Sequence, residues 1–183
     1  MRRIKFMLES VKHPRWTGAF CQSSKGLAQK MAQKIGNSKN VIEFGPGTGI
    51  ITHEILNCLP EDGHLTCFEI NPAFCKHLKK INDPRLTIIN DDAQNCQKYV
   101  KDYDCVVSGL PITVFTKPQR ENIIAISSKS KKYIQFQYTP FLRRKLSHHF
   151  ANVKLNFIAM NVPPAFIYIC SNYDKPKPER SAV

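Results

Sequence analysis

The chain alternates short apolar runs with stretches of helical periodicity from residue 40 onward. The apolar runs lie at 40–44, 64–69, 86–89, 103–107, 133–137, 153–159 and 166–170, and the helical stretches lie near 24–35, 50–58, 72–81, 93–100, 118–128 and 141–150. This alternation predicts an α/β fold in which helices cover both faces of a seven-stranded, mostly parallel sheet. The last two runs follow each other without a helix, so they predict an antiparallel hairpin. Ser23 and Ser24 are good N-cap residues and predict the start of the first helix.

Length and charge narrow the range of partners. With 183 residues, the chain can form one well-packed domain and is too short for two ordinary ones. The formal net charge of +13 favours a polyanionic partner, either nucleic acid or an anionic membrane face. The seven cysteines form no C-x-x-C pair and several lie in apolar runs, which predicts buried residues in a reducing compartment and no metal site. His148 and His149 are expected on the surface of a helix.

The strongest local signal is a glycine-rich turn directly after the apolar run 40–44. The turn reads Gly45-Pro46-Gly47-Thr48-Gly49 and leads into an apolar helix. Glycines let the backbone approach a ligand closely where a strand turns into a helix. Position 50 is Ile, so the turn is not the dinucleotide fingerprint G-x-G-x-x-G. Glu43 precedes the turn, and a carboxylate at this point suits the cationic amino group of a methionine moiety better than a pyrophosphate.

Two further acids follow the next two strands. Glu69 closes the run 64–69, where a carboxylate can accept hydrogen bonds from both hydroxyls of a ribose. Asp92 follows the run 86–89, where an acid can accept from an adenine amino group and the backbone N–H of Ala93 can reach the ring. Each acid alone is equally well explained as a helix N-cap. Three acids at the carboxyl ends of three successive strands instead indicate a site for S-adenosylmethionine.

Three other segments carry a family resemblance. They are Thr17-Gly18-Ala19-Phe20-Cys21-Gln22-Ser23-Ser24, Val107-Ser108-Gly109-Leu110-Pro111 and Asn161-Val162-Pro163-Pro164-Ala165-Phe166-Ile167-Tyr168. With the acids and the glycine-rich turn, they resemble class I methyltransferases of the rRNA adenine dimethylase-like branch, especially the bacterial phospholipid N-methyltransferase family. The resemblance spans residues 14–170 and implies the class I Rossmann-like fold. It also implies the activity, which is N-methylation of phosphatidylethanolamine, and of its mono- and dimethyl forms, toward phosphatidylcholine.

The resemblance divides the site residues between the cofactor and the methyl acceptor. The cofactor residues are Glu43, Gly45 and Gly47 at the methionine end, Glu69 at the ribose, Ile70, Asp92 and Ala93 at the adenine, and Ser108. The wall that faces the acceptor is formed by Ser108 to Pro111, with Leu110 and Pro111 as substrate-binding residues. Tyr138 follows the run 133–137 and is the candidate for orienting the amine of the substrate. A purely structural role explains Tyr138 equally well.

The main alternative is an adenine N6-methyltransferase that acts on rRNA or another nucleic acid. Such enzymes present Asn/Asp-Pro-Pro-Tyr or Asn-Leu-Pro-Tyr after the fourth strand, and the aromatic ring stacks on the extruded base. Here the segment Ser108-Gly109-Leu110-Pro111 is followed by Ile112, which we expect to pack in the core. The stacking ring, which contributes about 1–3 kcal/mol, is therefore missing. The sequence favours the lipid acceptor over the base.

Residues 1–13 predict a contact with the anionic membrane surface. As a helix, this segment has one apolar face, made by Ile4, Met7, Leu8 and Val11. Its basic residues lie to the sides or opposite, as in helices that lie in a bilayer interface. Docking of this helix on its own domain, as a lid, explains the same pattern.

The remaining expectations concern boundaries and location. We expect the methyltransferase domain at 14–172 and a flexible tail at 173–183, where the sequence is polar and Pro-rich. No apolar run reaches the ~20 residues of a membrane-spanning helix. We therefore expect a cytoplasmic protein that lies peripherally on the inner membrane.

Overall fold

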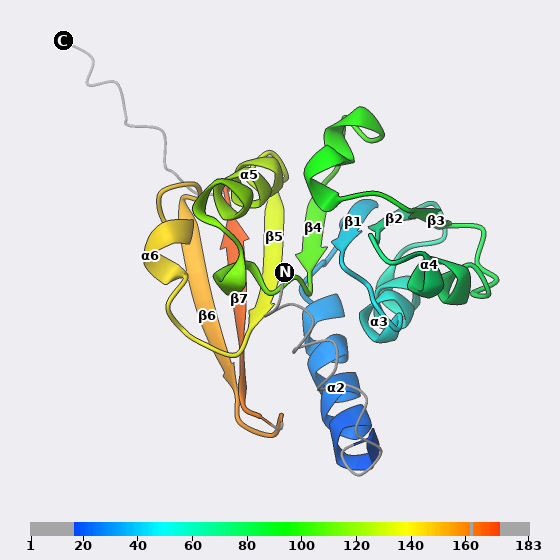
Figure 1. Ribbon diagram of the computed structural model, residues 1–183, viewed down its shortest axis with the longest axis horizontal. Coiled ribbons are helices and arrows are strands. Elements are labelled where there is room, and N and C mark those ends of the chain that lie inside the picture. Colours follow the sequence, from blue (N-terminus) through cyan, green and yellow to red (C-terminus); the bar gives the residue numbers. More distant parts are fainter. Residues whose placement is uncertain (1–16, 162, 173–183) are drawn as a thin grey trace.

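The computed structural model describes residues 17–161 and 163–172, with side chains from Lys25 onward (Figure 1). The predicted amphipathic helix 1–13 and the predicted tail 173–183 lie outside the described residues. In chain order the elements are α2 (Thr17–Ala32), β1 (Asn40–Phe44), α3 (Ile50–Cys58), β2 (His64–Phe68), α4 (Pro72–Leu78), β3 (Leu86–Ile89), the 3₁₀ helix η1 (Ala93–Lys98), β4 (Cys105–Ser108), the 3₁₀ helix η2 (Ile112–Val114), α5 (Lys117–Ser127), β5 (Lys132–Gln137), α6 (Arg143–Leu146), β6 (Asn152–Ile158) and β7 (Ala165–Ser171).

The seven strands form one sheet in the order β3-β2-β1-β4-β5-β7-β6. All neighbouring pairs from β3 to β5 are parallel, and β7 is antiparallel to both β5 and β6. β6 therefore runs in the same direction as β5. The predicted seven-stranded, mostly parallel sheet with a closing hairpin is confirmed.

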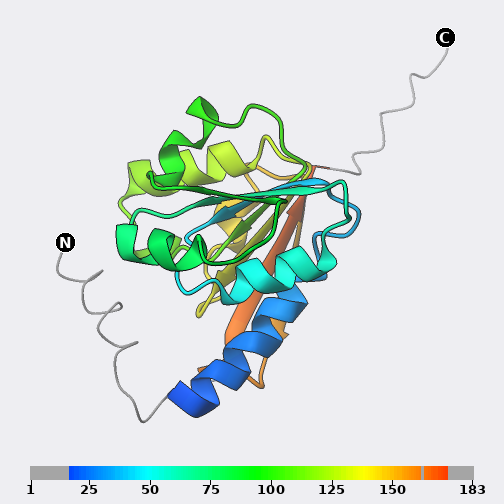
Figure 2. The same cartoon turned by 90° about the vertical axis from the view of Figure 1, so that its right-hand side faces the viewer.

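Helices cover both faces of this sheet, and each face has its own apolar core (Figure 2). On one face, side chains of α2 and α3 pack on the strands, with Met31 and Ile55 fully buried. On the other face, η1, α5 and α6 cover a core that includes Ile123, Tyr133 and Leu146. Burial on both faces explains why the central strands read as continuous apolar runs.

Local capping explains where two of the helices begin. Asn71 caps α4, because its Oδ1 accepts a hydrogen bond from the backbone N of Ala73 at 2.9 Å. Thr116 and Gln119 form a capping box at the start of α5. Both helices also have Pro in their first turn, where its missing N–H costs nothing.

Several predicted boundaries are wrong at the ends of helices. α2 begins at Thr17, so Ser23 and Ser24 lie inside the helix and are not its N-caps. α6 is a single turn. Its N-cap residue Leu142 forms no side-chain cap, and the Ser147 hydroxyl at its other end donates to the carbonyl of Arg143. The helix predicted near 93–100 is the 3₁₀ helix η1, which ends at Lys98.

Some side chains also differ from expectation. His148 and His149 follow α6 in a turn, and His149 Nε2 lies 3.2 Å from a carboxylate oxygen of Glu121. Cys58 is exposed, whereas the other cysteines with described side chains are buried as predicted. None of the helices in the described part of the chain has the length and apolar character needed to cross a bilayer.

Candidate active site

The predicted site residues meet at the carboxyl edge of the central strands. Phe44, the last residue of β1, pairs with Phe68 of β2 on one side and with Ser108 of β4 on the other. The segments that follow these three strands therefore leave the sheet at one level (Figure 1). In parallel α/β sheets, ligands bind at this edge.

The glycine-rich turn after β1 adopts a backbone that favours glycine. Gly45, Gly47 and Gly49 have φ angles of +69°, +56° and +84°, in the left-handed region. A Cβ on Gly45 would lie 2.6 Å from Cδ2 of Leu110, so the turn packs tightly on the segment after β4. A Cβ on Gly47 would meet no atom of the described part of the chain within 4 Å. The turn is therefore open at Gly47, where a ligand can approach the backbone.

Glu43 is a buried carboxylate directly before this turn. Its side chain is 1% exposed, and its Oε2 accepts hydrogen bonds from Thr52 Oγ1 at 2.7 Å and from Cys67 Sγ at 3.3 Å. Its Oε1 is buried and has no hydrogen-bond partner among the described residues. Burial raises the pKa of the Glu43 carboxyl to about 7, and the hydrogen bonds from Thr52 and Cys67 limit the rise. An unpartnered buried carboxylate oxygen fits a cationic ligand group at this point.

Glu69 ties the end of β2 to the glycine-rich turn. Its Oε2 accepts a hydrogen bond from the backbone N of Gly47 at 3.1 Å, and its Oε1 accepts one from the backbone N of Asn71 at 2.8 Å. A carboxylate has about four lone-pair sites, so each oxygen keeps room for another donor. The geometry therefore leaves both oxygens able to accept the two hydroxyls of a ribose.

The predicted adenine side lies between the ends of β2 and β3. Ile70 is 70% exposed, and its backbone carbonyl accepts a hydrogen bond from Asn90 Nδ2 at 3.2 Å. Asp92 caps η1, because its carboxylate accepts from both the backbone N and the side-chain amide of Gln94. Ala93 is buried directly behind it. Asp92 thus has the capping role that the sequence left open, while its part in adenine binding stays a prediction.

The segment after β4 is held by two buried glutamines. Gln135 Nε2 and Gln137 Nε2 both donate to the carbonyl oxygen of Leu110, at 3.0 and 2.8 Å. The backbone N of Leu110 donates to Ser108 Oγ at 3.3 Å. This network fixes the wall from Ser108 to Pro111 against the turn after β1.

The sequence analysis missed Gln135 and Gln137. They lie on one face of β5 and are buried, and both carry polar groups into an otherwise apolar strand. Two glutamines at positions i and i+2 of a core strand were the available signal, because such amides need buried partners. Thr52, the partner of Glu43, was also missed.

Tyr138 lies just past β5, at the same edge of the sheet. Its ring contacts that of Phe136 with a centroid distance of 4.8 Å and an edge-on angle of 80°. The side chain is 38% exposed, and partial burial raises the pKa of its hydroxyl. The phenol therefore stays neutral at physiological pH and is a hydrogen-bonding group, not a base.

Ile112, which follows the wall, is fully buried in the core on the α5 face. The expected packing role of this residue is confirmed.

Comparison with known proteins places this geometry in a family. The family model of ribosomal RNA adenine dimethylase matches residues 12–150. Ornithine lipid N-methyltransferase from Singulisphaera acidiphila is 26% identical over 179 residues, which cover 90% of this chain and 93% of that protein.

Solved structures share the fold. N-methyltransferase NodS from Bradyrhizobium japonicum WM9 superposes with a TM-score of 0.66 at 11% identity, covering 87% of this chain and 99% of that one. Magnesium protoporphyrin IX methyltransferase from Synechocystis PCC 6803, solved with bound S-adenosylmethionine, gives a TM-score of 0.63 at 10% identity over 82% of this chain and 78% of that one. The fold, the glycine-rich turn and the family match agree: the chain belongs to the ribosomal RNA adenine dimethylase family and is a class I methyltransferase that uses S-adenosylmethionine.

Proposed function

We propose that the enzyme methylates the amine of a membrane lipid, namely phosphatidylethanolamine and its mono- and dimethyl forms, toward phosphatidylcholine. The similarity to an ornithine lipid N-methyltransferase over nearly the whole of both chains supports a lipid acceptor. Phosphatidylethanolamine and ornithine lipid both present an amine next to an anionic group and acyl chains. The proposal thus rests on the amine, anionic group and acyl chains that the two lipids have in common, and it names phosphatidylethanolamine as the substrate.

One observation carries the choice of lipid over base. In adenine N6-methyltransferases the residue after the proline of the fourth-strand motif is an aromatic ring that stacks on the base. At this position the enzyme has Ile112, which is 0% exposed and packed in the core. The wall from Ser108 to Pro111 therefore offers no stacking platform, whereas an amine headgroup needs none.

The cofactor residues have separate tasks in this proposal. Glu43 holds the amino group of the methionine moiety through its unpartnered Oε1, next to Gly45 and Gly47. Glu69 accepts the ribose hydroxyls. The adenine lies against the exposed Ile70, with Asp92 and Ala93 at its edge and Ser108 on the side of the sulfur.

The acceptor residues orient the amine and exclude water. S-adenosylmethionine supplies an electrophilic methyl group, so positioning accounts for much of the catalysis. The amine attacks through its lone pair and must therefore be neutral. Tyr138 is a neutral phenol at the rim of the site and accepts a hydrogen bond from an N–H of the amine, while Leu110 and Pro111 form the apolar wall.

The experiment offers radiolabelled S-adenosylmethionine to the full chain with three acceptors in parallel. These are vesicles with phosphatidylethanolamine, vesicles with ornithine lipid, and unmodified rRNA. We expect label in phosphatidylethanolamine. Label in rRNA alone would replace the proposal with the adenine N6-methyltransferase alternative, and label in ornithine lipid alone would correct the headgroup.

Lipid methylation also requires the enzyme to reach the bilayer. We propose that residues 1–13 form an amphipathic helix on the anionic membrane surface, ahead of a methyltransferase domain at 14–172 and a flexible tail at 173–183. The alternation of apolar and basic residues in 1–13 supports this placement. The enzyme would then be a peripheral protein of the inner membrane.

A further inference from the structure

Charge is divided unevenly along the described chain. All of its Asp and Glu residues lie between Glu43 and Glu121, which is the half that builds the cofactor site. The span 122–172 contains no acid and carries Lys129, Lys131, Lys132, Arg143, Arg144, Lys145 and Lys154. This span forms β5, α6, β6 and β7. These elements lie on the side of the sheet where Tyr138 and the acceptor are placed.

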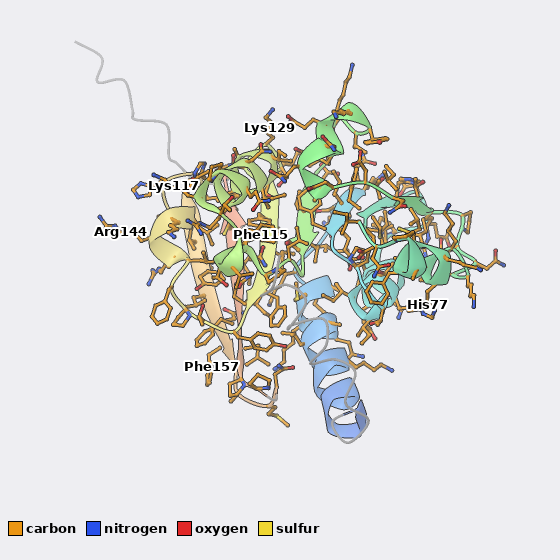
Figure 3. The ribbon with its side chains drawn as sticks, in the orientation of Figure 1. His77, Phe115, Lys117, Lys129, Arg144 and Phe157 are labelled. Atoms are coloured by element: carbon orange, nitrogen blue, oxygen red, sulfur yellow. The ribbon has the colours of Figure 1, made fainter. Side chains whose placement is uncertain are left out.

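The hairpin that joins β6 to β7 is apolar and exposed. No charged residue occurs in the span 155–170. Phe157 is 59% exposed and Met160 is 87% exposed, and Pro163 and Pro164 are exposed as well. Figure 1 shows the hairpin projecting past the ends of the neighbouring strands. In Figure 3, Phe157 lies toward this end of the molecule and Lys129 lies at the opposite end.

This apolar tip is built into a paired structure. β6 and β7 pair in continuous register from Asn152 with Ser171 to Ile158 with Ala165. The ring of Phe157 rests on that of Phe166, with centroids 5.2 Å apart. Exposing large apolar side chains on a fixed hairpin is unfavourable in water, and an exposed apolar patch usually marks a surface that meets an apolar partner.

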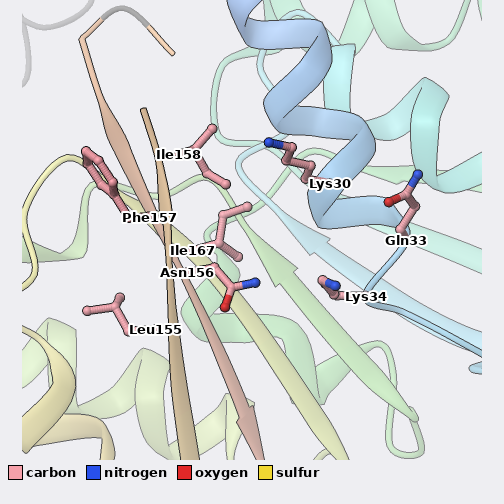
Figure 4. Close-up of a pocket in the computed structure, with 8 residues that line it drawn as sticks. All are labelled: Lys30, Gln33, Lys34, Leu155, Asn156, Phe157, Ile158 and Ile167. Carbon is pink, nitrogen blue, oxygen red and sulfur yellow. The ribbon is translucent and has the colours of Figure 1, made fainter. Parts of the chain in front are cut away.

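A groove beside the hairpin combines apolar and cationic walls (Figure 4). Its volume is about 550 Å³. Lys30 and Lys34 of α2 line one side, and Ile158 and Ile167 of the hairpin strands line the other. A groove of this composition suits a lipid, with the anionic group at the lysines and the acyl chain on Phe157, which also lines the groove and is exposed.

We propose that the tip of the β6–β7 hairpin, with Phe157 and Met160 as anchors, inserts into an anionic bilayer. This membrane contact is separate from residues 1–13, and it rests on the proposed lipid acceptor. Lys30 and Lys34, which line the groove beside the hairpin, meet the anionic headgroups, and each basic residue contributes about 1 kcal/mol near such a surface.

Insertion at this point would place the bilayer beside the acceptor wall. β6 and β5 run in the same direction with β7 between them, so the hairpin and Tyr138 lie at the same edge of the sheet. Adjacent strands are about 4.8 Å apart, which sets β6 about 10 Å from β5. A lipid held at the hairpin can thus reach the site with its headgroup.

The test measures co-sedimentation of the full chain with vesicles of phosphatidylcholine, with and without phosphatidylglycerol. Met160→Lys places a charge at the apolar tip while making the protein more basic. Met160→Leu keeps the apolar surface, and Ala125→Lys adds the same charge at an exposed position of α5. We expect about tenfold weaker binding to anionic vesicles for Met160→Lys, and unchanged binding for the two controls.

Unchanged or tighter binding of Met160→Lys would overturn the proposal, because an electrostatic surface alone gains from an added lysine. Tighter binding of both lysine variants to rRNA, with no vesicle binding by any protein, would assign the basic half to RNA instead. Phe157→Lys gives a second variant if one substitution perturbs the hairpin, and circular dichroism checks the fold. Co-sedimentation measures vesicle binding without methyl transfer. The membrane contact of the hairpin can therefore be judged even if the enzyme does not methylate the lipid.

Discussion

The carboxyl group of Glu43 should make stability and cofactor affinity depend on pH in opposite directions. Burial raises its pKa from 4.5 to about 7 in the folded protein. Between these pH values the folded protein holds a proton that the unfolded chain has released. The free energy of unfolding therefore falls as pH rises from about 4.5 to about 7 and is level above that. The difference in pKa corresponds to roughly 3 kcal/mol.

Cofactor affinity should rise over the same interval. The amino group of the methionine moiety is cationic, and the unpartnered Oε1 of Glu43 can bind it only when the carboxyl is ionised. Below the pKa, binding must first remove the proton from Glu43. The dissociation constant should therefore rise about tenfold for each pH unit by which the pH falls. At pH 7 about half of the molecules are protonated, and binding should release about half a proton.

Isothermal titration calorimetry can follow S-adenosylmethionine binding from about pH 5.5 to about pH 8. It measures how the dissociation constant changes with pH, and buffers of different ionisation enthalpy give the number of protons released on binding. Glu43→Gln is the control, because it keeps the size of the side chain and removes the titration. The variant should bind S-adenosylmethionine more weakly than wild type at pH 8. Its affinity should also lose the pH dependence that Glu43 contributes, and any pH dependence that remains comes from other groups. Equal slopes for wild type and variant, or affinity that does not change with pH, would refute the role given to Glu43.

The other predictions concern single positions. Glu69→Ala should weaken cofactor binding by roughly 1.5–3 kcal/mol in calorimetry, and Glu69→Gln by less, because the amide keeps one acceptor. Gly47→Ala should reduce affinity at a cost of about 1–2 kcal/mol in stability, whereas Gly49→Ala should cost more in thermal unfolding, since its Cβ would lie 2.8 Å from a side-chain carbon of Leu78. Tyr138→Phe should lower kcat up to about tenfold with little change in KM, and an unchanged kcat would make Tyr138 structural. Leu8→Glu should weaken vesicle binding at low and high salt; lost thermal stability with intact vesicle binding would indicate a docked lid.

The strands and the three acids were predictable because their signals are local. Each strand is a short apolar run, and each acid lies at the end of such a run or within three residues after it. Helix ends were predicted less well. Ser23 and Ser24 are favourable N-caps, but nothing in their own sequence excludes a further turn before them, and α2 begins at Thr17. Capping preference alone does not decide where a helix starts when the preceding residues also accept helical geometry.

The network around the acceptor wall was not predictable because its partners are distant in sequence. Gln137 donates to the carbonyl of Leu110 across 27 positions, and Thr52 donates to Glu43 from the helix that follows the turn. Periodicity indicates which face of a strand a residue occupies, but it does not indicate which buried polar groups meet there. By contrast, the core position of Ile112 was predictable, since isoleucine is among the residues most often fully buried.

The order of chemical groups across the sheet supports an amphiphilic acceptor. Acids lie at the ends of β1, β2 and β3, and the neutral phenol of Tyr138 lies at the centre, beside the wall after β4. The apolar hairpin of β7 and β6 follows, with Lys30 and Lys34 beside it. Phosphatidylethanolamine carries an amine, a phosphate and acyl chains in that order, so one molecule can meet all three regions while its amine stays at the cofactor. A nucleic acid would match the basic region but would leave Phe157 and Met160 in water, where their exposure has no compensating contact.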